Sequence, residues 1–364
     1  MYCRQLFFLG MGFLIEYTMS FLIQNNVLPF WYPLIPTKLL VKQKINKITF
    51  MDTPFVCYEK SNDTYILHSD ICPHQGASLA SKGWINSDGN LQCGYHGFEF
   101  CDGNFCKIPN PQKNPKRFKS KINIPLYPIQ KKNDFLFFQP FTNLETPEIF
   151  YPPEEFDESF RGVDGYRIVN SNYLTVCENL LDMLHISYVH SFGSTASPLP
   201  YDIKTKRLGE SSFQSQFHYY PNENTISKKI GGAPKVIVQN EYHLPTNTIT
   251  RVFAGEIIKT VFTRSIPISN NQTLLYWKMY RNFWLDPYFP IFNVFGDWLT
   301  RFLMSNTIDE DINMLKDVYD EHRQGPLITK YDITIVNFRK DMAKYISMQN
   351  KTLHSFQFNQ TFNL

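Results

Sequence analysis

The sequence has little excess of charge of either sign. Its 36 basic and 33 acidic residues leave a formal net charge of +3 over 364 residues, and it has no Arg-rich or Gly-rich repeat. Nucleic-acid-binding domains usually carry a strongly basic face, so this balance argues against nucleic acid as a partner. A G-x-G-x-x-G loop is also lacking, which argues against a dinucleotide site of that type.

Cysteine is scarce as well. The seven cysteines do not follow the spacing of a secreted disulfide framework, so we expect a reducing compartment, cytoplasmic or equivalent. Cys101 and Cys106 resemble the start of a ferredoxin-type C-x4-C-x2-C pattern, but position 109 is proline. We therefore expect both to be ordinary packed or free thiols.

Long apolar runs are nearly absent. The run from Leu6 to Ile23 just reaches the length needed to span a bilayer, and Glu16 lies near its centre. Three interpretations stay open for the predicted extension 1–26: a membrane anchor, a segment outside the fold, or a start assigned too early, with Met19 as the alternative.

Aromatic residues, by contrast, are abundant. The chain has 32 Phe and 21 Tyr, and 16% of its residues are aromatic, which predicts a large apolar pocket or an aromatic surface. The densest stretch is Phe283 to Met304. We expect it to pack in a core, with contact to a substrate entrance or a membrane surface as the alternative.

The pattern of apolar runs predicts two domains of an α+β protein. Short β-branched and aromatic runs separated by turn residues predict an antiparallel β domain over 27–141. A stretch rich in proline and acids, 142–159, predicts a linker. Alternating runs over 213–268, and a last one over 274–283 that closes the sheet, predict a large antiparallel sheet in 160–345, followed by a tail, 346–364.

Two loops of the first domain each carry one cysteine and one histidine. Cys72 and His74 belong to one loop, and Cys93 and His96 follow after eighteen intervening residues. Structural zinc sites usually group like ligands in pairs. The mixed loops instead suit a [2Fe-2S] cluster in which one iron binds both cysteines and the other both histidines.

A second histidine pair lies in the other domain. His185 and His190 are five residues apart, so on a regular helix they would point about 140° apart. If both bind one metal ion, the helix must bulge or end near Ser187. Asp182 lies one turn before His185 and can accept its remaining ring N–H. The alternative is that these histidines are ordinary core residues.

A carboxylate further along the chain can complete this site. Thr307 and Glu310 have the spacing of a capping box, and Asp309 would complement the helix dipole in the same first turn. Asp311 then remains free to face inward. Two histidines and one carboxylate form the facial triad of non-heme Fe(II) oxygenases.

Taken together, residues 27–343 resemble a Rieske non-heme iron oxygenase, terminal oxygenase component. The resemblance implies an N-terminal all-β Rieske domain followed by an antiparallel-sheet, helix-grip catalytic domain. It also implies one Rieske [2Fe-2S] cluster, one mononuclear non-heme Fe(II), and a head-to-tail homotrimer in which Asp182 connects His185 to His74 or His96 of another chain. The residues that carry it are Cys72, His74, Cys93, His96, Asn179, Asp182, His185, His190 and Asp311.

The same resemblance implies an activity. An external reductase or ferredoxin would supply electrons, and O2 would be used to hydroxylate or oxidatively demethylate an apolar, aromatic or large-ring organic substrate, as in vanillate O-demethylases and pheophorbide a oxygenases. A basic run, 113–121, could dock the donor, although a solvated loop is the preferred interpretation. Two rival functions stay open: a Rieske electron-transfer protein without catalytic iron, and a zinc-stabilised binding module.

Overall fold

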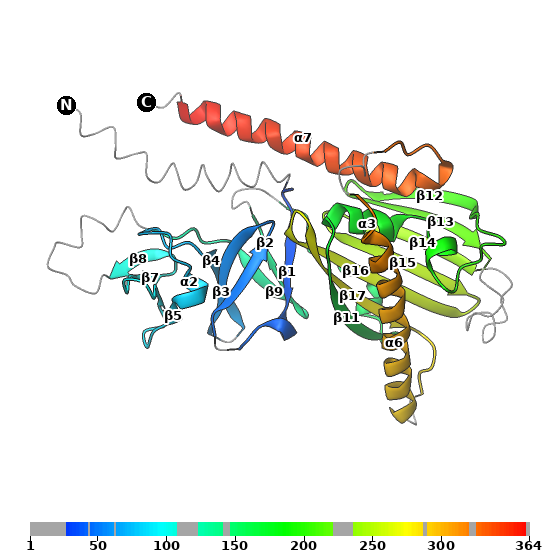
Figure 1. The fold of residues 1–364 in the computed structure, drawn as a ribbon, viewed down its shortest axis with the longest axis horizontal. Helices are drawn as coiled ribbons and strands as arrows, with labels where there is room; N and C mark the ends of the chain where they lie inside the picture. Colours follow the sequence, from blue (N-terminus) through cyan, green and yellow to red (C-terminus); the bar gives the residue numbers. More distant parts are fainter. Residues whose placement is uncertain are drawn as a thin grey trace. The chain divides into compact units, whose positions relative to one another are not determined.

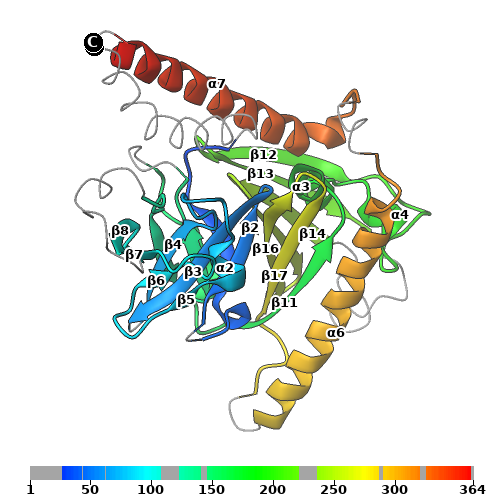
Figure 2. The same cartoon turned by 60° about the vertical axis from the view of Figure 1, so that its left-hand side comes forward.

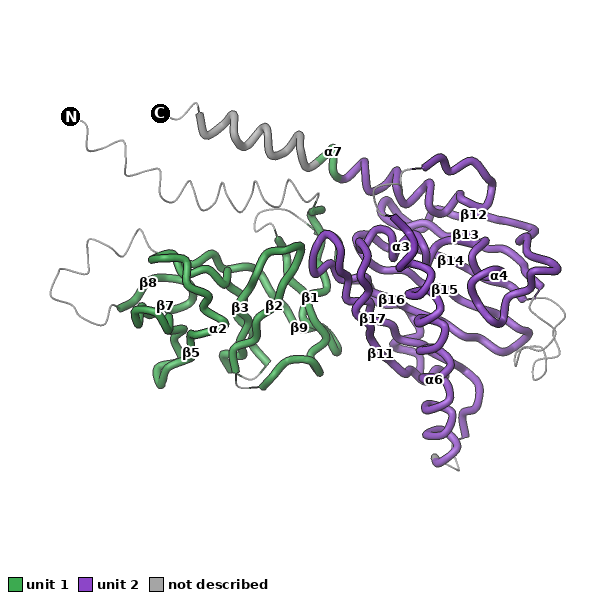
Figure 3. Tube along the Cα trace, viewed as in Figure 1, with its two compact units in different colours: residues 1–148, 346–364 green, residues 149–345 purple. Residues whose placement is uncertain are grey.

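A computed structural model describes most of the chain as two compact units (Figure 3). Unit 1 comprises 1–148 and 346–364, and unit 2 comprises 149–345. The predicted extension 1–26 and the basic run 113–121 lie outside the described residues, and no helix within these residues is long and apolar enough to cross a membrane. The described ranges are 27–42, 44–61, 63–107, 123–140, 146–220, 236–286, 290–319 and 325–361, with side chains for 291–319 and 325–348 in the last two.

Unit 1 consists of three small antiparallel sheets, with orders β1-β10-β9, β2-β3-β4 and β5-β6-β7-β8 (Figure 1). The sheets are short because turn residues interrupt the apolar runs every few positions. Their strands are β1 Tyr32–Pro36, β2 Asn46–Phe50, β3 Thr53–Ser61, β4 Thr64–Ser69, β5 Trp84–Ile85, β6 Leu91–Gln92, β7 Glu99–Cys101, β8 Asn104–Lys107, β9 Ile129–Lys132 and β10 Phe135–Phe138, with one short helix, α2 Leu79–Lys82.

Aromatic side chains hold unit 1 together. All four residues of β10 are buried, and Phe138 packs edge to face against Phe50 at 4.7 Å between ring centroids. Tyr32 and Phe55 join the same cluster. Such aromatic contacts add to the stability that burial alone provides. The two cluster cysteines, Cys72 and Cys93, pack in a separate core with Leu79, Leu91 and Phe100.

Unit 2 is built on one seven-stranded antiparallel sheet of order β11-β17-β16-β15-β14-β13-β12. This confirms the predicted large antiparallel sheet with few helices. The last strand along the chain, β17, was expected to close the sheet. It lies instead between β11 and β16, and β11 is the edge strand on that side. The strands are β11 Arg161–Val169, β12 Tyr201–Gly209, β13 Ser212–Tyr219, β14 Val236–His243, β15 Asn247–Ala254, β16 Ile257–Ser269 and β17 Gln272–Arg281.

Helices lie against this sheet and carry the second histidine pair. They are α3 Tyr173–Leu181, α4 Ile186–Val189, α6 Pro290–Leu315 and α7 Ile333–Thr361. Helix α3 packs across the central strands and α6 packs beside β11 and β17 (Figures 1 and 2). The core between α3, α6 and the sheet includes Val163, Val176, Leu275, Trp277, Ile308 and Leu315. The predicted tail 346–364 begins inside α7.

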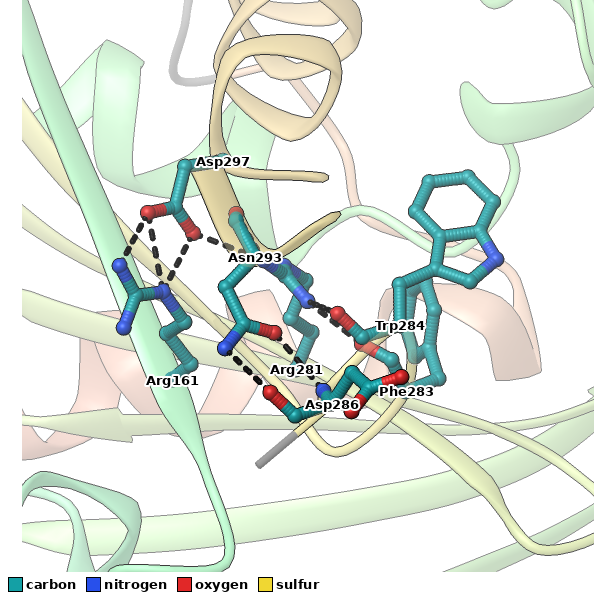
Figure 4. A network of polar contacts seen from close by, with 7 residues as sticks. All are labelled: Arg161, Arg281, Phe283, Trp284, Asp286, Asn293 and Asp297. Carbon is teal, nitrogen blue, oxygen red and sulfur yellow. Dashed lines mark hydrogen bonds and ion pairs between the residues drawn. The ribbon is translucent and has the colours of Figure 1, made fainter. Parts of the chain in front are cut away.

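The N-terminal half of α6 has its polar face inward (Figure 4). The buried guanidinium of Arg281 binds Asp297 at 2.7 Å and the carbonyl oxygen of Asn293 at 3.2 Å, and Arg161 binds the other oxygen of Asp297 at 2.6 Å. Gly296 is required here, because a Cβ at this position would come within 2.8 Å of the Arg281 guanidinium.

The opposite face of α6 is therefore apolar and exposed. The expectation that Phe283 to Met304 packs in a core is wrong for this face, because Asp297 pairs with the buried Arg281 on the inner side of α6 and the aromatic face is turned outward. This stripe, named the α6 stripe below, has the spacing of one helical face and consists of Ile291, Val294, Phe295, Trp298 and Phe302, each more than half exposed.

The acidic residues at the end of the predicted linker belong to unit 2. Glu154 is buried and forms an ion pair with Arg251, which also binds Glu241. Glu155 binds Lys278 at 2.6 Å. Buried carboxylates need such partners because unpaired charges are costly in a protein interior.

Candidate metal centres and the adjoining pocket

The two loops of unit 1 have the same backbone geometry. In the first, the N–H of Cys72 donates to the carbonyl oxygen of Ala77 at 2.8 Å; in the second, the N–H of Cys93 donates to that of Phe98 at 2.8 Å. A glycine four residues after each cysteine has positive φ, +73° at Gly76 and +70° at Gly97, a conformation that favours glycine. The repeated turn presents each cysteine in the same way, whereas the histidine follows it by two residues in the first loop and by three in the second.

The four side chains separate into an inner and an outer pair. Cys72 and Cys93 are buried, whereas His74 and His96 are exposed, with their ring centroids 4.8 Å apart. Burial raises the pKa of Cys72 to about 11, and the neighbouring Cys93 contributes to the rise. A buried thiol with a raised pKa, such as that of Cys72, is stabilised as a thiolate when it binds a metal ion. The arrangement fits the cluster predicted from the sequence, with two sulfur ligands inside and two imidazoles outside.

In unit 2, the end of a short helix brings the two histidines together. Helix α3 ends at Leu181, and the single turn α4 has His185 at its start and His190 at its end. The helix was expected to bulge or end near Ser187, and α4 ends two residues later, at Val189. His190 therefore has an extended backbone (φ −91°, ψ 138°) instead of continuing the helix, and the Nε2 atoms of the two histidines are 3.2 Å apart.

Asp311 reaches the same point from α6. Its Oδ1 lies 3.5 Å from Nε2 of each histidine. Three ligands on one face of an octahedral ion, each about 2.1 Å from it, would be about 3 Å apart. Asp311 is almost fully buried, at 4% exposure, and is held by the side-chain amide of Asn179 at 3.0 Å.

The hydrogen bonds of His185 and His190 favour the binding of a cation between these residues and Asp311. Nδ1 of His185 lies 2.9 Å from the carbonyl oxygen of Asp182, and Nδ1 of His190 lies 3.0 Å from Oε2 of Glu310. Both Nδ1 atoms therefore act as donors, which leaves lone pairs on both Nε2 atoms. Burial lowers the pKa of His190, so its ring favours the neutral form. Three acceptor atoms then face one another with no proton between them, an arrangement that a metal ion stabilises.

Two of the sequence-based assignments around this site were wrong. Thr307 and Glu310 do not form a capping box, because α6 begins at Pro290 and both lie inside it. Thr307 bonds the carbonyl oxygen of Leu303, and Glu310 binds His190 and the N–H of Ser191. Asp309 pairs with Arg167 instead of capping a helix. Tertiary packing determines that α6 begins at Pro290 and not near Thr307. The carboxylate of Glu310 is therefore not used as a helix cap and can orient His190.

Asp182 also differs from the expectation in detail. Within this chain its backbone carbonyl oxygen, not its carboxylate, accepts from His185. One carboxylate oxygen instead accepts the N–H of Leu184 at 2.7 Å. This Asx-type turn fixes the backbone between α3 and α4, so Asp182 positions His185 through the main chain.

The sequence analysis did not single out Gly193, which holds the chain just after His190 against α4. Gly193 donates its N–H to the carbonyl oxygen of His190 at 2.9 Å, and a Cβ at this glycine would clash with the backbone of α4 at Ile186 and Ser187. Its sequence signal is only its position three residues after a candidate ligand.

The triad opens onto a pocket of about 530 Å³. This volume falls in the range of small-molecule sites, and its walls are mostly apolar, formed by strands β13 to β17, α3, α4 and α6. The lining includes Phe192, Tyr219, Met279, Trp284, Leu303 and Met304. A metal ion held by the triad would therefore face an apolar ligand space.

Cys101 and Cys106 form a disulfide, so the expectation of free thiols is wrong. They belong to neighbouring strands β7 and β8, and the turn at Asp102 and Gly103 brings their Cα atoms to 5.9 Å. This is a usual separation for a bridge.

Comparison with known proteins identifies both units. Residues 30–128 match the Rieske [2Fe-2S] domain, and 169–348 match the vanillate O-demethylase oxygenase C-terminal domain. The fold is similar to that of dicamba monooxygenase bound to dicamba, with a TM-score of 0.70 and 20% identity over 89% of this chain and 98% of that one.

Curated relatives match more than half of the chain. Protochlorophyllide-dependent translocon component 52, chloroplastic, of Arabidopsis thaliana is 26% identical over 86% of this chain and 65% of its own length. The oxygenase component of dicamba O-demethylase of Stenotrophomonas maltophilia is 28% identical over 57% of this chain and 58% of its own length. The chain thus spans about three fifths of the length of these relatives. With both matched domains in this order on one chain, the protein belongs to the Rieske non-heme iron oxygenase family.

Proposed function

We propose that this protein is a terminal oxygenase component. It would take electrons from an external reductase or ferredoxin and use O2 to hydroxylate or oxidatively demethylate an apolar ring substrate. The observation that carries the proposal is the convergence of His185, His190 and Asp311 at the wall of an apolar pocket. When bound, a Rieske cluster would supply single electrons and a mononuclear iron would supply O2 activation.

The protein's own residues have distinct roles in this proposal. The triad would hold iron on one face and leave the pocket side open. Glu310 and the carbonyl oxygen of Asp182 hold both imidazoles in the tautomer that binds metal through Nε2. The apolar lining would exclude water and bind the substrate ring.

The test is the iron and acid-labile sulfide content of anaerobically purified protein, together with EPR of the reduced sample. We expect three irons and two sulfides per chain with a Rieske-type signal, and two irons in His185→Ala. A matched control is His218→Ala, because this half-buried histidine of β13 lies outside the triad. Two irons in the wild type, unchanged in His185→Ala, would instead support an electron carrier, and zinc without sulfide would support a zinc-binding module.

We further propose a head-to-tail homotrimer in which Asp182 connects His185 to a cluster histidine, His74 or His96, of another chain. In support, the second carboxylate oxygen of Asp182 has no hydrogen-bond partner among the described residues, and the two cluster histidines are exposed. Asp182→Asn should keep all three irons but slow reoxidation of the prereduced cluster by roughly 10–100-fold. Sedimentation velocity would measure the trimer, and an unchanged reoxidation rate would contradict the role of Asp182.

We also propose that the α6 stripe contacts a membrane surface. Helices that lie in a membrane interface bury Trp, Phe and Leu side chains on one face, and the N-terminal half of α6 extends past edge strand β11 in both views (Figures 1 and 2). Aromatic side chains bury about 200 Å² each, so the three half-exposed aromatic residues of the stripe offer roughly 350 Å². With the smaller Ile291 and Val294 the stripe stays below the about 800 Å² per partner of a stable protein interface.

Brominated-lipid quenching tests the membrane contact. Phosphatidylcholine vesicles carrying bromine in their acyl chains should quench a component of tryptophan emission that is missing in Trp298→Phe. The control Ile328→Ser, at a site 83% exposed outside the stripe, should keep it. If the stripe instead mediates self-association, sedimentation velocity would detect an oligomer that dissociates in Phe295→Ser, and the quenching would be absent.

We also propose that the protein works in a reducing compartment, cytoplasmic or equivalent. The cluster cysteines must stay reduced to bind iron, which supports a reducing compartment, cytoplasmic or equivalent, whereas the Cys101–Cys106 disulfide argues against it. Thiol titration of protein purified without air would show which state these two cysteines adopt.

A further inference from the structure

A lysine forms part of the pocket floor. Lys259 lies on β16 between Ile257 and Val261, and all three line the pocket, because every second residue of a strand points to the same face of the sheet. On the neighbouring strand β15, the residues opposite Ile257 and Lys259 are Ala254 and Val252, which also line it. The ammonium group is thus set among aliphatic side chains.

In the part of the chain that the structure describes, this ammonium has no anionic partner. Among the described residues, no carboxylate forms an ion pair with Lys259, and it is the only lysine or arginine that lines the pocket. The two acids of the lining are already used, Glu310 by His190 and Asp311 by Asn179 and the histidines. The Nζ atom of Lys259 lies 5.7 Å from the centroid of the Phe192 ring, which is within the range of a cation–π interaction.

Burial without a partner is energetically costly for a lysine. The side chain keeps some accessible surface because the pocket is hollow, yet it is densely surrounded by protein, and this burial lowers the pKa of Lys259. An anion in the pocket would restore a charge partner in a site of low dielectric, where such a pair is much stronger than in water. The free protein therefore has an unmet electrostatic requirement inside its ligand space.

The position of Lys259 relative to the triad is also informative. The Phe192 ring that lies near Nζ stacks on His190, with centroids 4.8 Å apart and an angle of 17° between the planes. One aromatic side chain thus contacts both the cation and a metal ligand. A substrate whose anionic group binds Lys259 would have its ring body beside Phe192 and its far end toward the triad.

We propose that Lys259 forms an anion subsite, so that the substrate is an apolar ring compound bearing an oxyanion such as a carboxylate, sulfonate or phenolate. This inference rests on the proposed function, because it concerns the same pocket. Lys259 is then a specificity residue: it would fix which end of the substrate faces the triad, since only one end can pair with the ammonium.

A matched pair of fluorescent probes tests the subsite without turnover. The anionic probe is 8-anilinonaphthalene-1-sulfonate, and N-phenyl-1-naphthylamine has the same ring system without the sulfonate. Thr250 lines the pocket from β15, opposite Val261 of β16, so a tryptophan at this position would fill the ligand space. Binding in the pocket is defined as the fluorescence signal that is lost in Thr250→Trp. This subtraction removes any binding of the probes to the α6 stripe.

We expect Lys259→Met to weaken pocket binding of the sulfonate at least tenfold while the neutral probe stays within twofold of wild type, and Lys259→Arg to retain sulfonate binding. Equal affinities of wild type and Lys259→Met for the sulfonate would overturn the proposal. A parallel loss of both probes would also overturn it, since the lysine would then only shape the pocket, as would the absence of pocket binding for either probe. Iron content is measured separately, so failure of the subsite and failure of the oxygenase proposal give different results.

Discussion

Removing the carboxylate of Glu310 should weaken iron binding although Glu310 is not itself a proposed ligand. Its Oε2 accepts from Nδ1 of His190 at 3.0 Å and its Oε1 from the N–H of Ser191 at 3.3 Å. In Glu310→Gln the single amide oxygen can still accept from the imidazole, but this bond is no longer charge-assisted, and the amide NH2 group cannot accept the N–H of Ser191. Charge-assisted bonds contribute about 1.5–3 kcal/mol and neutral ones about 0.5–1.5 kcal/mol, so the loss is about 1–1.5 kcal/mol.

That difference corresponds to roughly a tenfold weaker affinity for Fe(II). Glu310→Ala loses both hydrogen bonds and leaves the ring free to rotate, so we expect a loss nearer 100-fold, the upper end for groups that orient metal ligands. The graded order, wild type above Gln above Ala, follows from the geometry. A purely steric role for Glu310 predicts no difference between wild type and Gln.

The assay is anaerobic titration of iron-depleted protein with Fe(II) in competition with a chelator, with the EPR signal of the Rieske cluster as an internal check. Asp309→Asn is the matched control, because it removes a carboxylate from the adjacent position of α6 that pairs with Arg167 on the protein surface. Equal affinities in wild type and Glu310→Ala would refute the reasoning, as would an Asp309→Asn variant that loses iron to the same extent.

Three further outcomes are expected. Asn179→Leu removes the donor that holds Asp311 and should lower Fe(II) affinity by roughly tenfold, measured by the same titration; unchanged affinity would show that packing alone fixes the carboxylate. Gly193→Ala should displace the segment after His190 from α4 and reduce iron content while the cluster signal stays intact, and full iron occupancy would contradict this. Burial raises the pKa of Asp297, but hydrogen bonds from Arg161 and Arg281 outweigh it, so the net pKa is lowered; its stabilising effect is present above the unfolded carboxyl pKa of about 4 and is lost as pH falls through the folded pKa. The Tm of Asp297→Asn should therefore be below that of wild type at pH 7 and approach it near pH 3, whereas a constant difference would exclude a role for the Asp297 charge.

The chemistry of both metal sites could be predicted from local sequence. Cys72 and His74, like Cys93 and His96, act through a few neighbouring residues, and a short turn with glycine determines how they are presented. The five-residue spacing of His185 and His190 likewise indicated an interrupted helix, because it is incompatible with one regular helical face. Alternating apolar runs predicted the large antiparallel sheet for the same local reason.

Only the tertiary structure decided what each remaining polar group does. Glu310 resembled a helix cap because its sequence neighbours suit a helix start, but α6 begins at Pro290, where packing on Arg281 holds its first turns. The outward orientation of the α6 stripe has the same cause, since burying an arginine and its aspartate partner forces the aromatic face of the helix into solvent. Lys259 showed no sequence signal at all, because a lysine within a strand is usually a surface residue, and only the folded strands β13 to β17 with helices α3, α4 and α6 enclose the space around it. Burial and pairing of charge depend on residues far apart in the chain, so they are determined by the fold and not by local pattern.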